Sequence, residues 1–198
     1  MLKGVDPSPI TYHPSPMTIE NIIITIGSYA PDFELPGTDE QVHHLCRYLE
    51  RFSGVGVIFL GNNCPYVNCY IPRLKQIQDQ FEHQGFTLVG INANDVYQYP
   101  AESFEEMKQF CQTQQLNFPY LWDPTQDVAH SFGAQKTTEA FLIDHKGIVC
   151  YNGSIDDNPQ DGDAVQAHYL NSAIASLLTG QEISPQSTKV TGSPIQWR

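Results

Sequence analysis

The chain has 198 residues, of which 40% are apolar, and this size suits one domain with tails. Its 22 acidic and 10 basic residues give a formal net charge of −12. Such a surface repels phosphate backbones and anionic lipid head groups, so nucleic acid and membranes are unfavourable partners. No run approaches the roughly 20 apolar residues that span a bilayer, and the beginning of the sequence lacks the apolar region of a secretion signal. We therefore predict a soluble, cytoplasmic protein.

The first 20 residues contain Pro7, Pro9, Pro14 and Pro16 among polar residues. Such a composition resists both helix and central strand, so we interpret residues 1–20 as a proline-rich arm. Residues 181–198 are interpreted as a C-terminal tail, from which Ile195 and Trp197 could dock on the folded body. One folded domain is predicted between them, over residues 21–180.

The first half of this domain alternates between the hydrophobic periods of strands and helices. A continuous apolar run at residues 55–61 indicates a strand buried on both faces, and residues 86–94 are interpreted as another buried strand. Between them, apolar residues recur at helical spacing and the pattern ends near Gly85; they are Ile71, Leu74, Ile77 or Gln78, and Phe81.

The second half continues in the same way. A helix beginning near Ser103 is predicted, with Phe104, Met107 and Cys111 on its inner face, followed by an extended segment over residues 117–123. Residues 140–153 indicate two strands joined by a turn at residues 145–147. A last helix ends at Gly180 and presents Val165, Tyr169, Ile174 and Leu177. This order predicts an α/β fold with a mixed central sheet flanked by helices.

Five cysteines are present: Cys46, Cys64, Cys69, Cys111 and Cys150. Without an export signal, a structural disulfide framework is unfavourable, so we expect burial, metal binding or redox chemistry. Cys64 follows a buried strand and precedes a helix, where free N–H groups and the helix dipole favour a thiolate. Pro65 suits the first helical position, which makes Cys64 the predicted N-cap and reactive thiol. The alternative is an inert buried cysteine, against which the polar Gly61-Asn62-Asn63 lead-in argues because it predicts an exposed loop.

Cys69 lies five residues after Cys64. In an intact helix this separation is about 140° around the axis and about 7.5 Å along it, beyond the roughly 7 Å limit for a disulfide. The bond therefore requires the first turns to unwind. Pro72 weakens that region because it has no N–H for the carbonyl of Asn68. The alternative is that Cys69 packs on the inner face while Pro72 only kinks the helix.

Several segments occur in a specific order: SYAPDFELP, CPYVNCYIPRL, NAND, YPAESFEEMKQF, FPYLWDPTQDVAHSFGA, FLIDHKG and YNGSIDD. Over about residues 20–195, this order and spacing resembles the thioredoxin-like redoxins of the alkyl hydroperoxide reductase and thiol-specific antioxidant superfamily. The resemblance implies a thioredoxin-like fold with Cys64 at the reactive position. The folded domain, residues 21–180, is then a redoxin domain.

Three positions depart from that pattern. Gly61 stands where close relatives have a second cysteine and where peroxidatic relatives have Thr or Ser. Thr138 stands where the thioredoxin branch has a cis-proline and the peroxidase branch an arginine. Ser193 stands where relatives tend to have a cysteine in the terminal motif. The chain therefore lacks part of the residue set that the thioredoxin branch uses, and part of the set that the peroxidase branch uses.

The remaining C-x-x-x-x-C spacing resembles that of Q-type peroxiredoxins, which implies attack of the Cys64 thiolate on a peroxide or a protein disulfide. With peroxide, a sulfenic acid forms that Cys69 condenses into a disulfide, and a dithiol reductant protein resets it. The alternative is a catalytically degenerate redoxin that serves as a binding, scaffold or redox-sensing protein. Candidate supporting residues, each of which could equally be an ordinary polar or loop residue, are Asn62, Asn63, Pro65, Tyr66, Thr137, Thr138 and Glu139.

No metal or nucleotide cofactor is indicated, because paired C-x-x-C, H-E-x-x-H and glycine-rich phosphate motifs are missing from the sequence. The acidic segment at residues 156–163 does not fit a calcium loop, since Pro159 takes its third position. Helix capping by Asp161 or Asp163 is the favoured role for this segment.

Overall fold

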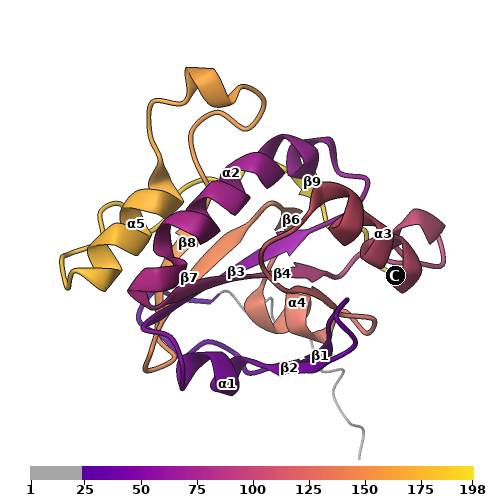
Figure 1. Ribbon diagram of the computed structural model, residues 1–198, viewed down its shortest axis with the longest axis horizontal. Helices are drawn as coiled ribbons and strands as arrows, with labels where there is room; N and C mark the ends of the chain where they lie inside the picture. The colour runs from indigo at the N-terminus through magenta and orange to yellow at the C-terminus, as the bar shows by residue number, and fades with distance from the viewer. Residues whose placement is uncertain (1–23) are drawn as a thin grey trace, which may run out of the picture.

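A five-stranded mixed sheet forms the centre of the molecule, which the computed structural model describes over residues 24–198 (Figure 1). β3 lies in the middle because it pairs in parallel with β4 and antiparallel with β7. The order is β5-β4-β3-β7-β8, with β3 (Gly54–Leu60), β4 (Phe86–Asn92), β5 (Tyr120–Trp122), β7 (Ala140–Asp144) and β8 (Val149–Gly153). The predicted α/β fold with a mixed sheet is confirmed. The predicted arm, residues 1–20, lies outside the described residues.

Helices cover both faces of the sheet (Figure 1). One face carries α2 (Pro65–Phe81), α3 (Phe104–Gln114) and α5 (Tyr169–Leu178), and the other carries α1 (Leu45–Leu49) and α4 (Asp127–Phe132). Side chains of β3 alternate between the layers: Ile58 belongs to the α2 side and Val57 to the opposite side. Both faces of β3 are buried, which explains its continuous apolar sequence.

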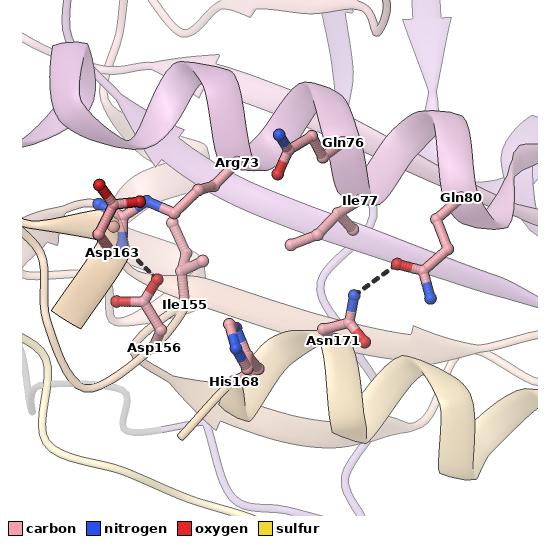
Figure 2. A pocket seen from close by; sticks show the side chains of 10 residues that line it. Arg73, Gln76, Ile77, Gln80, Ile155, Asp156, Asp163, His168 and Asn171 are labelled. Atoms are coloured by element: carbon pink, nitrogen blue, oxygen red, sulfur yellow. Dashed lines mark hydrogen bonds and ion pairs between the residues drawn. The ribbon is translucent and has the colours of Figure 1, made fainter. Parts of the chain in front are cut away.

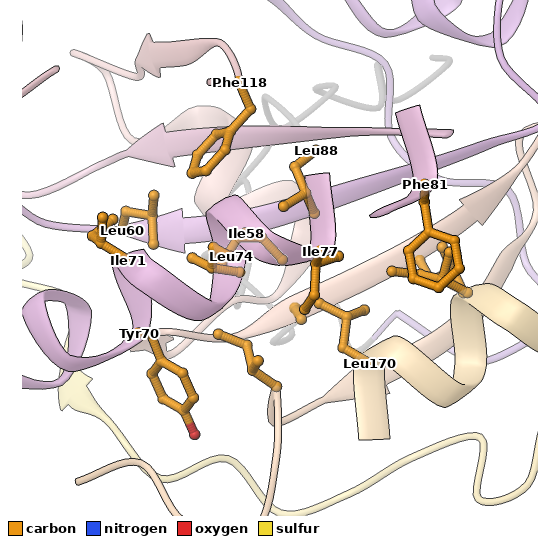
Figure 3. Close-up of a cluster of buried hydrophobic side chains, with 14 of the residues drawn as sticks. Ile58, Leu60, Tyr70, Ile71, Leu74, Ile77, Phe81, Leu88, Phe118 and Leu170 are labelled. Carbon is orange, nitrogen blue, oxygen red and sulfur yellow. The ribbon is translucent and has the colours of Figure 1, made fainter. Parts of the chain in front are cut away.

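α2 contributes more buried side chains than any other element to the core on its side of the sheet (Figure 3). Ile71, Leu74 and Phe81 are buried beside Leu88 of β4, as their helical spacing predicts. After α2 the chain reaches Gly85, whose φ of 85° is a left-handed conformation that glycine adopts without steric cost. The predicted end of the helix near Gly85 is therefore confirmed.

Shorter elements complete the described fold. β1 (Glu34–Pro36) pairs antiparallel with β2 (Val42–His44), and β6 (Lys136–Thr137) pairs antiparallel with β9 (Ser193–Pro194). Single turns of 3₁₀ helix occur at Glu82–Gln84, Pro100–Glu102 and Gly162–Ala164. β9 belongs to the predicted tail, residues 181–198, which runs back across the molecule to the region of α3 (Figure 1).

The tail is docked on the body. Ile195 is 3% exposed within the core cluster on the α4 side of the sheet. Trp197 stacks on His130 of α4, with 4.2 Å between the ring centroids. The backbone N–H of Asp95 also donates to the carbonyl of Gln196 at 2.8 Å. These contacts fix the segment that follows Gly192.

The last helix begins later than the sequence predicts. α5 starts at Tyr169, and Val165 lies outside it, directly after the Gly162–Ala164 turn. The carboxylate of Asp161 accepts from the N–H of Asp163 at 3.0 Å and caps that short turn, as favoured for this segment. The helical spacing of Val165 is therefore a coincidence of sequence rather than a sign of one continuous helix.

A partly buried ion pair ties the loop that precedes α5 to α2 (Figure 2). The guanidinium of Arg73 pairs with the carboxylate of Asp156, whose side chain is 2% exposed. Arg73 also donates to the carbonyls of Asn158 at 2.8 Å and Pro159 at 2.9 Å, and Tyr70 donates to Asp156 at 3.0 Å. A cavity of about 300 Å³ lies beside this network. Because both charges are shielded from water, each depends on the other for solvation.

Removing Arg73 should be costly. We expect Arg73→Met to lower the free energy of unfolding by about 3–5 kcal/mol, because Asp156 would keep a buried charge without its partner. The matched control is Arg47→Met, whose pair with Glu50 has side chains 74% and 66% exposed and should cost about 1 kcal/mol or less. Urea unfolding measures both; equal losses would contradict the assigned role of the pair.

Candidate active site

Cys64 begins α2 directly after the loop that follows β3. Its backbone is extended, with φ −78° and ψ 120°, and its carbonyl accepts the N–H of Asn68 at 3.2 Å. Pro65 occupies the first helical position, so the predicted N-cap is confirmed. Within residues 24–198 the Cys64 side chain makes no capping bond, which leaves the sulfur at the positive end of the helix.

Two hydroxyl groups flank the Cys64 sulfur. Thr137 Oγ1 donates to Sγ at 3.0 Å, and Sγ donates to Ser193 Oγ at 3.3 Å. When the thiol ionises, the serine hydroxyl can turn and donate as well, because a hydroxyl is both donor and acceptor. Two donors and the helix N-terminus would then stabilise one negative charge.

The sulfur lies beside a cavity rather than on an open loop. Cys64 is 6% exposed and Asn62 is 9% exposed, while Asn63 is exposed. The predicted exposed lead-in is therefore wrong for Gly61 and Asn62, because tertiary contacts cover both. A cavity of about 210 Å³ lies at the sulfur, and its lining comes from the loop before α2, the segment after β4, β6 and the tail: Asn63, Cys64, Asn94, Tyr99, Glu102, Thr137, Ser193, Pro194 and Gln196.

The loop before α2 is held by a buried carboxylate that the sequence reasoning missed. Glu102 is 4% exposed, and its two oxygens accept from the backbone N–H groups of Asn62 at 2.8 Å and Asn63 at 3.2 Å. Asn92 of β4 donates to the same carboxylate at 2.8 Å. The only sequence signal for Glu102 was its place in the YPAESFEEMKQF segment. That segment does not predict the hydrogen bond to Asn62, which lies 40 residues earlier in the chain.

Asn62 is a structural residue of the loop. Its amide donates to the carbonyl of Ala101 at 2.9 Å and accepts from the hydroxyl of Tyr120 at 3.0 Å. Burial, together with the negative charge of Glu102, raises the pKa of Tyr120 well above its usual range, so this tyrosine stays a neutral donor. The loop conformation is thus fixed from both sides.

The side-chain amide of Asn94 occupies the space beside Gly61. A Cβ at this position would overlap the side-chain amide nitrogen of Asn94, which is itself buried. The space that a second cysteine would need is therefore filled by an amide. Where a C-x-x-C pattern would place its first cysteine, this chain has Gly61 with the Asn94 amide beside it.

The other predicted site residues lie elsewhere. Cys69 is exposed on α2, so the interpretation that it packs on the inner face is wrong. Tyr66 is half-buried against the core, and Thr138 is buried and joined to Thr137 by a cis peptide bond. Glu139 accepts from Gln135 N–H at 3.0 Å and from the Asn152 amide at 3.0 Å, which ties the turn before β7 to β8. Of the predicted set, Cys64, Asn63 and Thr137 line the cavity.

Two further cysteines are shielded from ionisation. Burial raises the pKa of the Cys111 thiol, which contacts Thr38 Oγ1 at 3.2 Å. Burial likewise raises the pKa of the Cys150 thiol, which donates to the carbonyl of Ile148 at 3.4 Å. Since the thiolate is the nucleophile, both are less reactive at neutral pH than an unperturbed thiol.

The Thr137 hydroxyl can be tested directly. Thr137→Val keeps the side-chain shape and removes the donor, so alkylation of Cys64 by iodoacetamide at neutral pH should slow about threefold to tenfold. Thr87→Val is the matched control, because Thr87 is also buried but bonds to Leu88 in β4. An unchanged rate in Thr137→Val would show that the hydroxyl does not act on the sulfur.

A mixed sheet, a cysteine at the start of the helix after β3 and a short strand facing it define a thioredoxin-like redoxin. Residues 26–152 match the model of the AhpC/TSA family, and the chain belongs to this family, as its sequence segments predict.

Similar proteins support this assignment. A thiol-disulfide oxidoreductase, ResA of Geobacillus thermodenitrificans, is 28% identical over 130 residues, which are 66% of this chain and 70% of that protein. The crystal structure of a hypothetical protein from Sinorhizobium meliloti 1021 is 31% identical, with TM-score 0.82 over 88% of this chain and 96% of that one. An uncharacterised conserved protein from Geobacillus kaustophilus is 30% identical, with TM-score 0.83, over 89% and 94%.

Proposed function

We propose that this protein is a thiol-disulfide oxidoreductase in which Cys64 is the attacking thiol. The observation that carries the proposal is the sulfur itself, placed at the N-terminus of α2 between the hydroxyls of Thr137 and Ser193 and beside a cavity. The similarity to a ResA protein supports the same reaction class.

The reaction begins when Cys64 loses its proton to solvent. The thiolate attacks one sulfur of a disulfide, forms a new S–S bond and expels the other sulfur as a thiolate, which carries away the electron pair. The helix N-terminus and the two hydroxyls stabilise the negative charge on Cys64 before attack. When the S–S bond forms, that charge is transferred to the leaving sulfur. A second thiol, supplied by a dithiol partner protein, then attacks the mixed disulfide and frees Cys64.

Glu102 acts in this scheme as a positioning residue. It holds the two N–H groups that precede Cys64, at 2.8 and 3.2 Å, and so fixes where the sulfur enters the cavity. Asn94 fills the place of a second thiol beside Gly61. For this reason the mixed disulfide on Cys64 is expected to persist until another thiol attacks it. That thiol comes from a partner protein, or from Cys69 once the first turns of α2 have opened.

A reducing compartment keeps Cys64 in the form that the mechanism needs. Within residues 24–198, no helix has the length and hydropathy required to cross a membrane. We keep the cytoplasm as the proposed location, and cell fractionation tests it.

Oxidised glutathione provides a simple test of the attacking thiol. At neutral pH we expect a glutathione mixed disulfide on Cys64, located by peptide mapping, because this thiol lies at the helix N-terminus. Cys64→Ser should remove it. Cys46→Ser, which changes an exposed cysteine outside the site, should leave it in place. Modification confined to Cys46 and Cys69 in the unaltered chain would refute Cys64 as the attacking thiol.

The role of Cys69 as a resolving thiol is a second part of the proposal. Cys69 is exposed and lies five residues beyond the N-cap, so a Cys64–Cys69 disulfide requires the first turns of α2 to open. One equivalent of hydrogen peroxide should then consume two thiols and give this disulfide by peptide mapping, whereas Cys69→Ser should stop at one thiol. If both thiols stay free, the two-cysteine peroxidase mechanism is excluded.

A binding or redox-sensing protein without turnover is the second candidate. The filled space at Gly61 favours it, because the Asn94 amide lies where the usual partner thiol would be. The glutathione experiment separates the two functions, since a protein without turnover would leave Cys64 unmodified or would not release glutathione to an added dithiol.

A further inference from the structure

β6 is a two-residue strand that ends at the reactive sulfur, and its edge is occupied by the tail of the same chain. β9 pairs with it antiparallel, with Lys136 opposite Pro194 and Thr137 opposite Ser193. Short exposed strand edges are places where extended polypeptides bind by main-chain hydrogen bonds. Here Ser193 and Pro194, within the tail segment 190–198, already occupy that edge.

The tail brings its own side chain to the sulfur. Ser193 Oγ lies 3.3 Å from Cys64 Sγ. Serine and cysteine share the same skeleton and differ in the terminal atom, so a cysteine held in this register places its sulfur against Cys64. Attack on a disulfide requires this kind of direct sulfur contact, followed by displacement of the second sulfur.

Neighbouring positions of the tail define further contacts. A Cβ on Gly192 would overlap the carbonyl of Thr137, so this position accepts only a residue without a side chain. Two residues after Ser193, Ile195 inserts into the core on the α4 side, and its N–H donates to the carbonyl of Gln135 at 3.0 Å.

The last contact of the tail is aromatic. Four residues after Ser193, Trp197 stacks on the His130 ring with an interplanar angle of 17°. Glycine, a thiol-sized residue, a large aliphatic residue and an aromatic residue thus occur at fixed spacing along one extended segment.

We propose that residues 190–198 are an internal pseudosubstrate that covers the binding edge for an extended polypeptide carrying an oxidised cysteine. This inference rests on the proposed function and adds its substrate class. The substrate places its cysteine at the position of Ser193, glycine before it, a large aliphatic residue two positions later and an aromatic residue four positions later. The tail must leave β6 before such a segment binds.

The burial of the sulfur is consistent with this arrangement. Cys64 is 6% exposed, and Ser193, Pro194 and Gln196 supply one wall of the 210 Å³ cavity beside it. A small disulfide or a peroxide needs only the cavity, whereas a polypeptide disulfide needs the strand edge. Tail displacement should therefore accelerate reaction with a polypeptide but not reaction with a small disulfide, because it also withdraws the Ser193 hydroxyl and one wall of the cavity.

The test uses the full chain and a peptide with the sequence of residues 190–198 in which cysteine replaces the serine. That cysteine carries an aromatic thiol as a mixed disulfide. When Cys64 attacks the peptide sulfur, the Cys64–peptide bond forms and the coloured aromatic thiolate leaves. A peptide of scrambled sequence with the same disulfide is the second substrate, and a small aromatic disulfide is the third.

Ile195→Ala loosens the tail by removing its buried anchor. The matched control is Ile183→Ala, because Ile183 is also a buried isoleucine of the tail, residues 181–198, but lies outside residues 190–198 and packs in the other core cluster. Circular dichroism establishes that both variants are folded. We expect Ile195→Ala to react about tenfold faster or more with the cognate peptide than the unaltered chain or Ile183→Ala, because its anchor is weakened. The scrambled peptide should show no such gain.

Equal rates in all three proteins, or equal rates for the cognate and scrambled peptides with Ile195→Ala, would overturn the pseudosubstrate proposal. The small disulfide separates this failure from failure of the proposed function. If Cys64 reacts with the small disulfide but without peptide preference, only the pseudosubstrate fails. If Cys64 is inert to every disulfide, the proposed function fails with it.

Discussion

The hydrogen bonds between the buried carboxylate of Glu102 and the backbone of Asn62 and Asn63 determine where the Cys64 sulfur lies. Backbone N–H groups in a loop ahead of a helix have no partners in the helix itself, and a buried donor without an acceptor is costly. The carboxylate satisfies two of them at once and is fixed in turn by Asn92 of the central sheet. Through this chain of contacts, the loop that carries Cys64 is tied to the central sheet.

The three departures from the redoxin pattern occupy one small region. The amide of Asn94 fills the space beside Gly61, the hydroxyl of Ser193 contacts the sulfur, and Thr138 follows Thr137, which donates to it. Where relatives offer thiols, this chain surrounds a single cysteine with hydroxyls and amides. These groups can donate hydrogen bonds to a thiolate, but none of them carries a second sulfur.

Long periodic segments were predictable because their pattern reflects burial on one or two faces. β3, β4 and α2 agree with the sequence interpretation for this reason. The start of α5 was misplaced because Val165 has helical spacing while a capped turn interrupts the chain before Tyr169. The five-residue α1 and six-residue α4 are too short to produce a periodic signal, and their conformation depends on tertiary packing.

The sequence by itself determined the mixed sheet, the cysteine at the start of α2 and the family, because these depend on local hydrophobic period, on the Cys-Pro junction and on ordered motifs. Only the tertiary structure decided what surrounds the sulfur. Thr137 and Ser193 reach it from 73 and 129 residues away, and Glu102 holds the loop before it from 40 and 39 residues away. Contacts over such separations leave no local pattern, since they arise when the folded sheet brings distant loops to the same edge.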